Sequence, residues 1–321
     1  MRDKYIKAEI IADSITDRGN RLTTFVVTCP RIVLAEFNTH RMLSRNSASS
    51  RAIPFETMLE KVISDPFIPI KWQKDHKGMQ GSEYLSGRDV EFADNTWLRA
   101  RDKAVLEAKM LNHNIGVTKQ FCNRLLEPFL YHTIIVTASE WENFFALRAH
   151  EAAEIHIQNL AFKMLDEYNN STPKLLKEGE WHIPFGDNMN HGKLRDLFWE
   201  IYQNQDPSYN DYQKEQVKIA TARCARVSYL NYEGGDDYKK DIELHDRLAS
   251  MGHWSPFEHC ARVMTEVEYN TYSYNMPILD EKNQPIPNVG TSDFGWSGNF
   301  KGFVQYRKMF TGENKSDARV L

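Results

Sequence analysis

The sequence contains few cysteines and no motif that would bring them together. The 321 residues include four of them, which form no C-x-x-C pair and lie far apart, namely Cys29, Cys122, Cys224 and Cys260. This spacing argues against a zinc ribbon or a disulfide framework and is typical of buried thiols in a reducing cytoplasm. None of the four lies in sequence that would activate a thiolate, so we do not expect a cysteine nucleophile.

Other class-defining segments are also missing. No apolar run approaches the roughly 20 residues that span a bilayer, and the first residues, M-R-D-K-Y-I-K, lack the apolar core of a signal peptide. The net charge of −4 gives no reason to expect nucleic acid or a membrane surface as a partner. The sequence has no G-x-G-x-x-G, G-x-x-x-x-G-K-[ST], H-E-x-x-H or G-x-S-x-G motif. His253 and His259 are separated by six positions across a proline, which fits no common ligand spacing, so no metal is expected.

A local positive region extends from Asn38 to Ile53. No carboxylate occurs between Glu36 and Glu56, and the interval holds His40, Arg41, Arg45 and Arg51 together with Ser44, Ser47, Ser49 and Ser50. Arginine offers a fixed fork of donors that matches phosphate, and small serines let backbone amides approach an anion. The segment therefore suits phosphate binding; a solvated basic loop is the alternative.

Hydrophobic periodicity and turn residues predict the main elements. We expect strands over 5–13, 21–28, 131–137 and 261–267, and helices over 32–37, 96–113, 117–127, 140–168, 194–202, 238–251 and 298–309. Residues 66–94 and 172–190 are expected to be irregular. We expect one catalytic domain over 1–321, with 1–170 and 215–310 forming one core and a linker at about 171–214.

Arg148 lies in the expected helix 140–168, four residues after Phe144 and seven before Ile155. It therefore points toward the apolar side of that helix. A charge there is unfavourable unless it is paired or functional. Snorkelling to the edge of the core is the alternative.

Several segments together resemble the flavin-dependent thymidylate synthases, whose signature is R-H-R followed after seven residues by Ser. Here Thr39-His40-Arg41 is followed after seven residues by Ser49, and Ser44, Asn46 and Arg51 also match the pattern. N-R-L-L-E-P resembles the family's segment with a substrate-binding arginine, here Arg124, and N-F-F-A-L-R resembles the helix with Asn143 toward flavin and Arg148 toward the pyrimidine. A-R-V-S-Y and G-H-W-S-P-F-E-H resemble the family's opening region, which places His253, Ser255 and Glu258 along flavin and folate.

The sequence departs from the family pattern in three ways. The last two segments come after the others, as in a circular permutation, which folds tolerate when the termini lie close together. Thr39 and Ser47 stand where the family has Arg and Glu. Glu36 replaces a family Gln, and we hypothesise that Gln305 and Arg307 take over the missing Gln and Arg roles.

The resemblance implies an α+β fold with a twisted antiparallel sheet flanked by long helices. It also implies bound FAD, NADPH as reductant, and transfer of a one-carbon unit from methylenetetrahydrofolate to C5 of dUMP, giving dTMP. Arg148 and Ser49 would be catalytic, and the nucleotide would be bound by Ser49, Ser50, Arg51, Arg124, Arg148, Gln305 and Arg307. Flavin would be bound by His40, Arg41, Ser44, Asn46, Asn143, His253, Ser255 and Glu258. In the family the site is shared between subunits of a homotetramer.

Two alternatives remain open. The departures at Glu36, Thr39 and Ser47 could accompany another deoxypyrimidine monophosphate such as dCMP, or a hydroxymethyl product. A protein of another class would keep the phosphate-binding segment as a non-catalytic nucleotide-binding protein without flavin.

Overall fold

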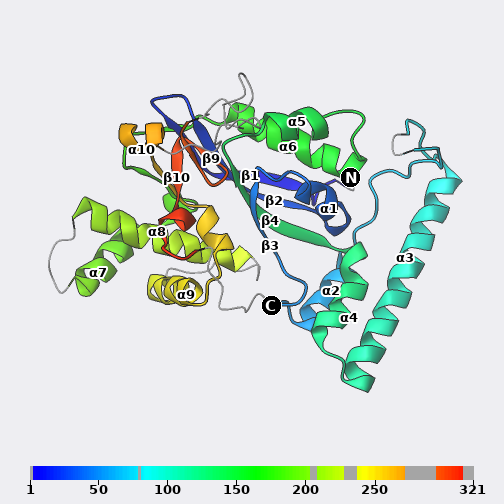
Figure 1. The fold of residues 1–321 in the computed structure, drawn as a ribbon. Helices are drawn as coiled ribbons and strands as arrows, with labels where there is room; N and C mark the ends of the chain where they lie inside the picture. Colours follow the sequence, from blue (N-terminus) through cyan, green and yellow to red (C-terminus); the bar gives the residue numbers. More distant parts are fainter. Residues whose placement is uncertain (1–2, 79–80, 203–207, 228–236, 272–293, 314–321) are drawn as a thin grey trace, which may run out of the picture.

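A computed structural model describes residues 3–78, 81–202, 208–227, 237–271 and 294–313. At its centre is a twisted five-stranded sheet in the order β3-β4-β2-β1-β5 (Figure 1). The predicted α+β fold is confirmed. The sheet is antiparallel except at one edge, where β5 runs parallel to β1. Its strands are β1 (Lys7–Thr16), β2 (Arg21–Pro30), β3 (Ser44–Ser47), β4 (Tyr131–Ala138) and β5 (Lys174–Leu176).

The three long strands, β1, β2 and β4, form where the sequence is rich in β-branched residues, and strands were predicted at all three places. The turn between β1 and β2 contains Gly19, whose φ of 83° lies in the left-handed region that glycine adopts without a steric penalty. Central strands β2 and β4 are buried almost throughout, since elements pack against both of their faces.

One face of the sheet is covered by α5 (Glu142–Arg148) and α6 (Ile155–Asn170) (Figure 1). The core between helices and sheet includes Phe25, Val27, Val136, Phe144, Ile157, Leu160 and Met164. The prediction of one helix over 140–168 was wrong, because the chain breaks between Arg148 and Ile155. Ala149 leaves the helical region with ψ of 51°, and the Glu154 carboxylate accepts hydrogen bonds from the backbone N–H groups of His156 and Ile157. This side-chain cap starts a second helix.

A group of helices beside the sheet consists of α2 (Phe55–Ser64), α3 (Arg88–Lys109) and α4 (Lys119–Leu126). Helix α3 ends in a π-helical turn, η2 (Met110–Ile115), and Gly116 with φ of 82° reverses the chain, as its position predicted. The 3-10 turn η3 (Glu127–Phe129) leads from α4 into β4. Apolar residues of α2, α3 and α4 share a core that includes Met58, Leu59, Val62, Ala108, Cys122 and Leu126.

Most of the described residues from Trp181 onward form a second layer on the other side of the sheet (Figure 1). It contains α7 (His191–Ile201), α8 (Tyr209–Arg226), α9 (Tyr238–Ser250) and a small sheet in the order β10-β7-β6, that is, Phe303–Gln305, Ala261–Val263 and Trp181–His182. The shorter pieces are η4 (Gly186–Asn188), η6 (Ser255–Glu258), α10 (Glu266–Thr271), β8 (Trp296–Ser297), β9 (Phe300–Lys301) and η7 (Tyr306–Met309). This layer packs on the main sheet, since Val26 and Ile135 share a buried cluster with Phe185, Cys224 and Val227.

Three expectations for this layer were wrong in part. The interval 172–190 contains the short strands β5 and β6, whereas α7 begins three residues before the helix expected over 194–202. The strand expected over 261–267 ends at Val263. The helix expected over 298–309 is mainly β9 and β10 followed by the 3-10 turn η7, because Gly298 and Gly302, with φ of 60° and 80°, turn the chain too sharply for a helix. Residues 228 and 229 of the A-R-V-S-Y segment lie outside the described residues. The single catalytic domain stays a prediction.

Candidate active site

The Ser/Arg segment is not a plain loop. After η1 (Arg31–Val33) and α1 (Leu34–Asn38), the chain turns at His40 and enters β3, which pairs with the edge of β4 through Ser44↔Thr137 and Asn46↔Ile135. Ser44 and Asn46 are buried, whereas Arg45 and Ser47 are half-buried. The S-R-N-S sequence has weak strand propensity, so the strand forms because β4 supplies unpaired backbone groups at this edge.

Arg148 and His40 are in direct contact. Arg148 Nε donates to His40 Nε2 over 2.9 Å, and an Nη2 group donates to the Thr39 hydroxyl over 3.2 Å. Burial, followed by the positive charges of Arg148 and Arg45, lowers the pKa of His40 from 6.5 to about 4. His40 is therefore neutral at physiological pH, with its proton on Nδ1 and its Nε2 lone pair directed to the guanidinium. Arg148 is the last residue of α5, where a cation also interacts favourably with the helix dipole.

Two of the cavities that adjoin the segment are lined by residues expected to bind flavin. The first, the Arg41 cavity, has a volume of about 420 Å³ and is lined by Thr39, His40, Arg41, Met42, Leu43, Glu140, Glu142, Asn143, Phe144 and Trp296. The second, the His253 cavity, has a volume of about 480 Å³ and is lined by Arg45, Asn46, Ser47, Ala225, Leu248, His253, Ser255 and Pro256. Six of the eight residues expected to bind flavin thus line these two cavities, although they are far apart in the sequence. Ser44 and Glu258 belong to polar networks beside them.

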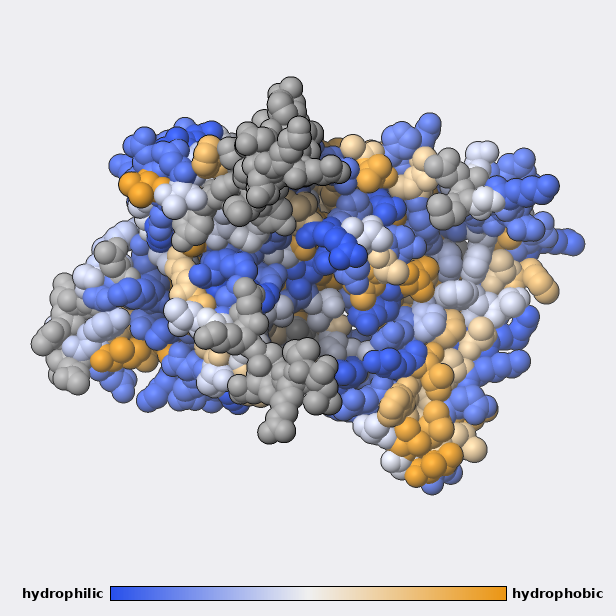
Figure 2. All heavy atoms as spheres, viewed as in Figure 1, coloured by the Kyte–Doolittle hydropathy of each residue, from blue (hydrophilic) through white to orange (hydrophobic). Residues whose placement is uncertain are grey.

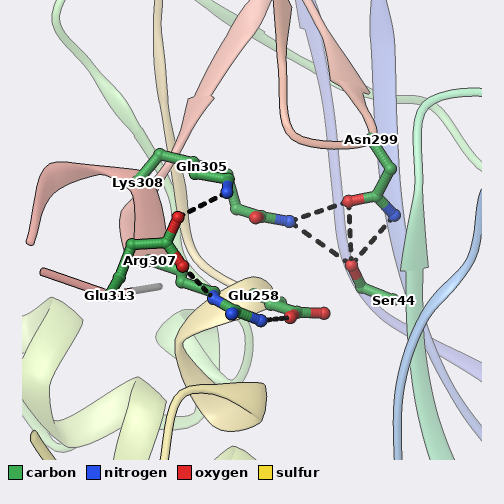
Figure 3. A network of polar contacts seen from close by, with 7 residues as sticks. All are labelled: Ser44, Glu258, Asn299, Gln305, Arg307, Lys308 and Glu313. Atoms are coloured by element: carbon green, nitrogen blue, oxygen red, sulfur yellow. Dashed lines mark hydrogen bonds and ion pairs between the residues drawn. The ribbon is translucent and has the colours of Figure 1, made fainter. Parts of the chain in front are cut away.

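Ser44 is held by a residue that the sequence analysis did not single out. The Asn299 side chain donates to Ser44 Oγ over 3.0 Å and to the Met42 carbonyl over 2.8 Å (Figure 3). Gln305 Nε2 donates to Asn299 Oδ1 over 2.9 Å and also lies 3.3 Å from Ser44 Oγ. The β8–β9 turn therefore fixes the start of β3. Only the three-dimensional fold reveals the role of Asn299, because it lies 255 positions from Ser44.

Glu258 and Arg307 form a second network (Figure 3). An Nη1 group of Arg307 donates to Glu258 over 2.5 Å, and its Nε donates to Glu313 over 2.7 Å, while Lys308 also pairs with Glu313. Gln305 is 2% exposed. The structure thus gives Gln305 and Arg307 partners within the chain. A direct contact of either with a nucleotide stays a prediction and would require these bonds to exchange.

The phosphate-binding candidates lie elsewhere. Ser50 is buried and donates to Glu127 over 2.5 Å, and its carbonyl accepts from the Asn123 amide over 2.7 Å. Arg51 and Arg124 are exposed, and neither forms an ion pair within the described parts of the chain. Ser49, Arg51 and Arg124 line neither the Arg41 cavity nor the His253 cavity. Within one chain, the structure therefore does not bring the expected phosphate ligands to the expected flavin ligands.

A buried chain of hydrogen bonds links the main sheet to η6. His182 bonds Ser14 through Nδ1 over 2.9 Å and Thr24 through Nε2 over 2.8 Å. Thr24 bonds Thr137 over 2.7 Å, and Thr137 bonds Nδ1 of His259 over 2.8 Å. Burial lowers the pKa of both histidines to about 3, so both are neutral. These hydrogen bonds fix the position of His259 and of the adjoining η6, which supplies Ser255 to the His253 cavity. The sequence analysis did not predict this hydrogen-bonded network.

In the ranges that the structure describes, no three His, Cys, Asp or Glu side chains lie close enough together to hold a metal ion. No described helix combines the length and apolar character needed to cross a membrane.

Comparison with known proteins finds a similarity to one family over a part of the chain that includes the Ser/Arg segment. Residues 22–174 match the profile of Thy1, the thymidylate synthase complementing protein. The Thy1 segment contains β2, the Ser/Arg segment, α4, β4 and α5, and therefore both Arg124 and Arg148. His253, Ser255, Glu258, Gln305 and Arg307 lie beyond it, so the expected permutation stays a prediction.

Solved structures give a more distant likeness. The UMP/dUMP methylase PolB from Streptomyces cacaoi bound with 5-Br UMP is 17% identical, with a TM-score of 0.43 over 51% of this chain and 88% of that chain. The same enzyme bound with 5-Br dUMP is also 17% identical, with a TM-score of 0.41 over 51% of this chain and 89% of that chain. A comparison with curated protein sequences found no match.

Proposed function

We propose that the protein methylates C5 of dUMP in a flavin-dependent reaction and produces dTMP, with methylenetetrahydrofolate as the one-carbon donor and NADPH as the reductant. The observation that carries the proposal is the contact between Arg148 and neutral His40 beside the Arg41 cavity, within the Thy1 segment. The proposal makes the chain a nucleotide methyltransferase.

Arg148 would bind the pyrimidine ring and stabilise negative charge that develops on it. The side chain is half-buried, so its charge acts in a lower dielectric than water provides. Because His40 is neutral and accepts one N–H of the guanidinium, it orients Arg148 without cancelling its charge. The exposed Arg51 and Arg124 would neutralise the 5′-phosphate together with Ser49 and Ser50.

The residues around the two cavities fit a flavin. The His253 cavity combines donors, Arg45, Asn46, His253 and Ser255, with apolar walls from Ala225, Leu248 and Pro256, as a flat ring with polar edges requires. His40, Arg41 and Asn143 offer further polar groups at the Arg41 cavity, and Ser44 and Glu258 support the two walls through their networks. When bound, FAD would supply the hydride that completes the methyl group.

The state of the cysteines supports a route without an enzyme thiolate. All four are free and buried. Burial raises the pKa of Cys29 and Cys260 to about 12 and also raises the pKa of Cys224. These thiols remain protonated at neutral pH, which makes them poor nucleophiles. Free, buried thiols also accord with the cytoplasmic location that we propose.

Arg124 lies on a surface that suits a second copy of the chain. Exposed apolar residues gather at the tip of α3, η2 and α4, with exposed fractions of 58% for Leu106, 68% for Ile115 and 64% for Phe121. Figure 2 shows the resulting orange patch at the lower right of the molecule. A patch of this kind on a helical projection indicates an interaction surface. We propose a homo-oligomer, as in the family's tetramers, in which this tip brings Arg124 to the site of a neighbouring subunit.

Replacing Phe121 by glutamate is expected to weaken this assembly. Loss of a central aromatic contact typically costs about 2 kcal/mol, or roughly thirtyfold in the dissociation constant. Light scattering across a dilution series measures the mass. Phe92→Glu, at the other end of α3 and 69% exposed, is the matched control and should assemble as wild type. A wild-type chain that is monomeric at all concentrations would refute the shared site.

The function is tested with a visible spectrum and a tritium-release assay. After addition of FAD, the protein should show flavin bands that shift when dUMP is added. Supplied with methylenetetrahydrofolate and NADPH, it should release tritium from C5-labelled dUMP. Release from C5-labelled dCMP alone would instead favour the alternative pyrimidine substrate, and product chromatography separates methyl from hydroxymethyl. A protein that never takes up flavin would be a non-catalytic nucleotide-binding protein.

A further inference from the structure

A cavity of about 340 Å³ lies at the opposite edge of the main sheet from β3. Its walls come from β1, the segment from β5 to α7, and the first half of α8. None of the residues assigned above to the nucleotide or to flavin lines it. It is therefore a separate site, and the proposed function does not depend on it.

Gln216 is the unusual residue in this cavity. Its side chain is 9% exposed, and within the described ranges its amide has no hydrogen-bond partner. Gln213, one helical turn earlier, is also buried, but its amide donates to the Tyr209 hydroxyl over 3.2 Å. The Gln216 amide atoms are not among the fully buried polar atoms that lack a partner, so they remain accessible from the cavity that the residue lines. Gln216 thus offers one donor and one acceptor, side by side, to an occupant of the cavity.

Aromatic rings complete the lining. Trp181 and Tyr212 are half-buried and Tyr209 is 66% exposed, and all three face the cavity from β6 and α8. Tyr212 is held by its contacts with the His191 ring, 3.2 Å from its hydroxyl, and with Phe198. Aromatic walls of this kind stack well on a flat ring.

The charges select against an anionic occupant. Glu180 and Asp187 line the cavity, and Lys174 is its cationic residue, while Asp13 is already neutralised by Arg21 at 2.6 Å. The remaining charges sum to a negative value, so a phosphate or a carboxylate in the cavity would be repelled. An uncharged ring is favoured.

We propose that this cavity binds an uncharged heteroaromatic ring whose edge carries an adjacent hydrogen-bond donor and acceptor, of the purine or pterin type. The Gln216 amide pairs with that edge in a bidentate manner, as glutamine pairs with adenine in other recognition sites. Tyr209 and Trp181 contact the ring from the sides.

The test is isothermal titration of the full chain, without added FAD, with two uncharged probes, adenosine and pterin. Binding at the proposed flavin site would not respond to substitution of Gln216, which lines neither the Arg41 cavity nor the His253 cavity, so failure of the proposed function would not be mistaken for failure of this one. At least one probe should bind the wild-type protein. Gln216→Leu, which preserves volume and removes the amide, should weaken that binding about tenfold or more, and Tyr209→Ala severalfold. Gln120→Leu, on exposed α4, is the control and should leave it unchanged.

Which of the two probes binds identifies the chemical class of the natural ligand. Binding of adenosine indicates a nucleoside ligand, and binding of pterin indicates a folate. Tyr209 is exposed, so Tyr209→Ala remains a valid test if Gln216→Leu does not fold. The proposal is overturned if neither probe binds, or if a probe binds equally well to wild type and to the folded variants.

Discussion

Replacing Arg148 by alanine is expected to lower turnover on dUMP by about a hundredfold to a thousandfold, the loss that follows removal of one preorganised donor from an oxyanion-type site. The guanidinium is held by His40 and Thr39 before any substrate binds, so little reorganisation is needed when charge develops on the ring. Steady-state kinetics measures the effect. A role in the transition state predicts a larger fall in kcat than rise in KM.

A second readout of the same substitution does not depend on activity. The positive charge of Arg148 contributes to the low pKa of His40, although burial is the larger cause. In Arg148→Ala the His40 pKa should therefore rise above about 4, which NMR of the imidazole signals measures. Arg99→Ala removes an exposed arginine of α3 and should alter neither turnover nor the His40 signal. Wild-type kcat in Arg148→Ala would contradict the pyrimidine assignment.

Local sequence was sufficient to predict those elements that are stabilised mainly by interactions between residues close in the sequence. β2 and β4 contain runs of β-branched residues, and Gly116 and Gly252 mark helix ends through positive φ angles of 82° and 70°. Helix α2 could also have been predicted, because Phe55, Met58, Leu59 and Val62 follow helical spacing and are all buried. The sequence therefore contains the signal for this helix, although the helix was not among the predicted elements.

Other features depend on partners that a local pattern does not contain. β3 has no β-branched residue and is a strand only because it pairs with β4, nearly ninety positions later. The break after Arg148 depends on a capping glutamate within a sequence whose apolar periodicity continues through it. The resemblance placed His40 and Arg148 in one site, but their mutual hydrogen bond, across 108 positions, required the fold.

The buried chain of hydrogen bonds through His182 and His259 is expected to make the protein sensitive to acid. Both imidazoles have a pKa of about 3 in the folded protein against 6.5 ordinarily. Between these values the unfolded chain binds protons that the folded protein does not, so the free energy of unfolding falls as pH decreases. Each such histidine contributes a slope of up to about 1.4 kcal/mol per pH unit. The contribution is fully present above pH 6.5 and is lost by about pH 3.

His259→Gln isolates one of the two contributions. Glutamine keeps an amide that can bond the Thr137 hydroxyl but cannot titrate, so the slope of unfolding free energy against pH should decrease by about 1.4 kcal/mol per unit below pH 6.5. Urea denaturation at several pH values measures the slope. His76→Gln, on an exposed segment, should leave it as in wild type. An unchanged slope in His259→Gln would mean that His259 binds a proton equally in both states. In that case the buried imidazole would be protonated within the folded protein. Since it cannot be solvated where it lies, the contact between η6 and the main sheet would have to open, and the His253 cavity would lose one wall at the same pH.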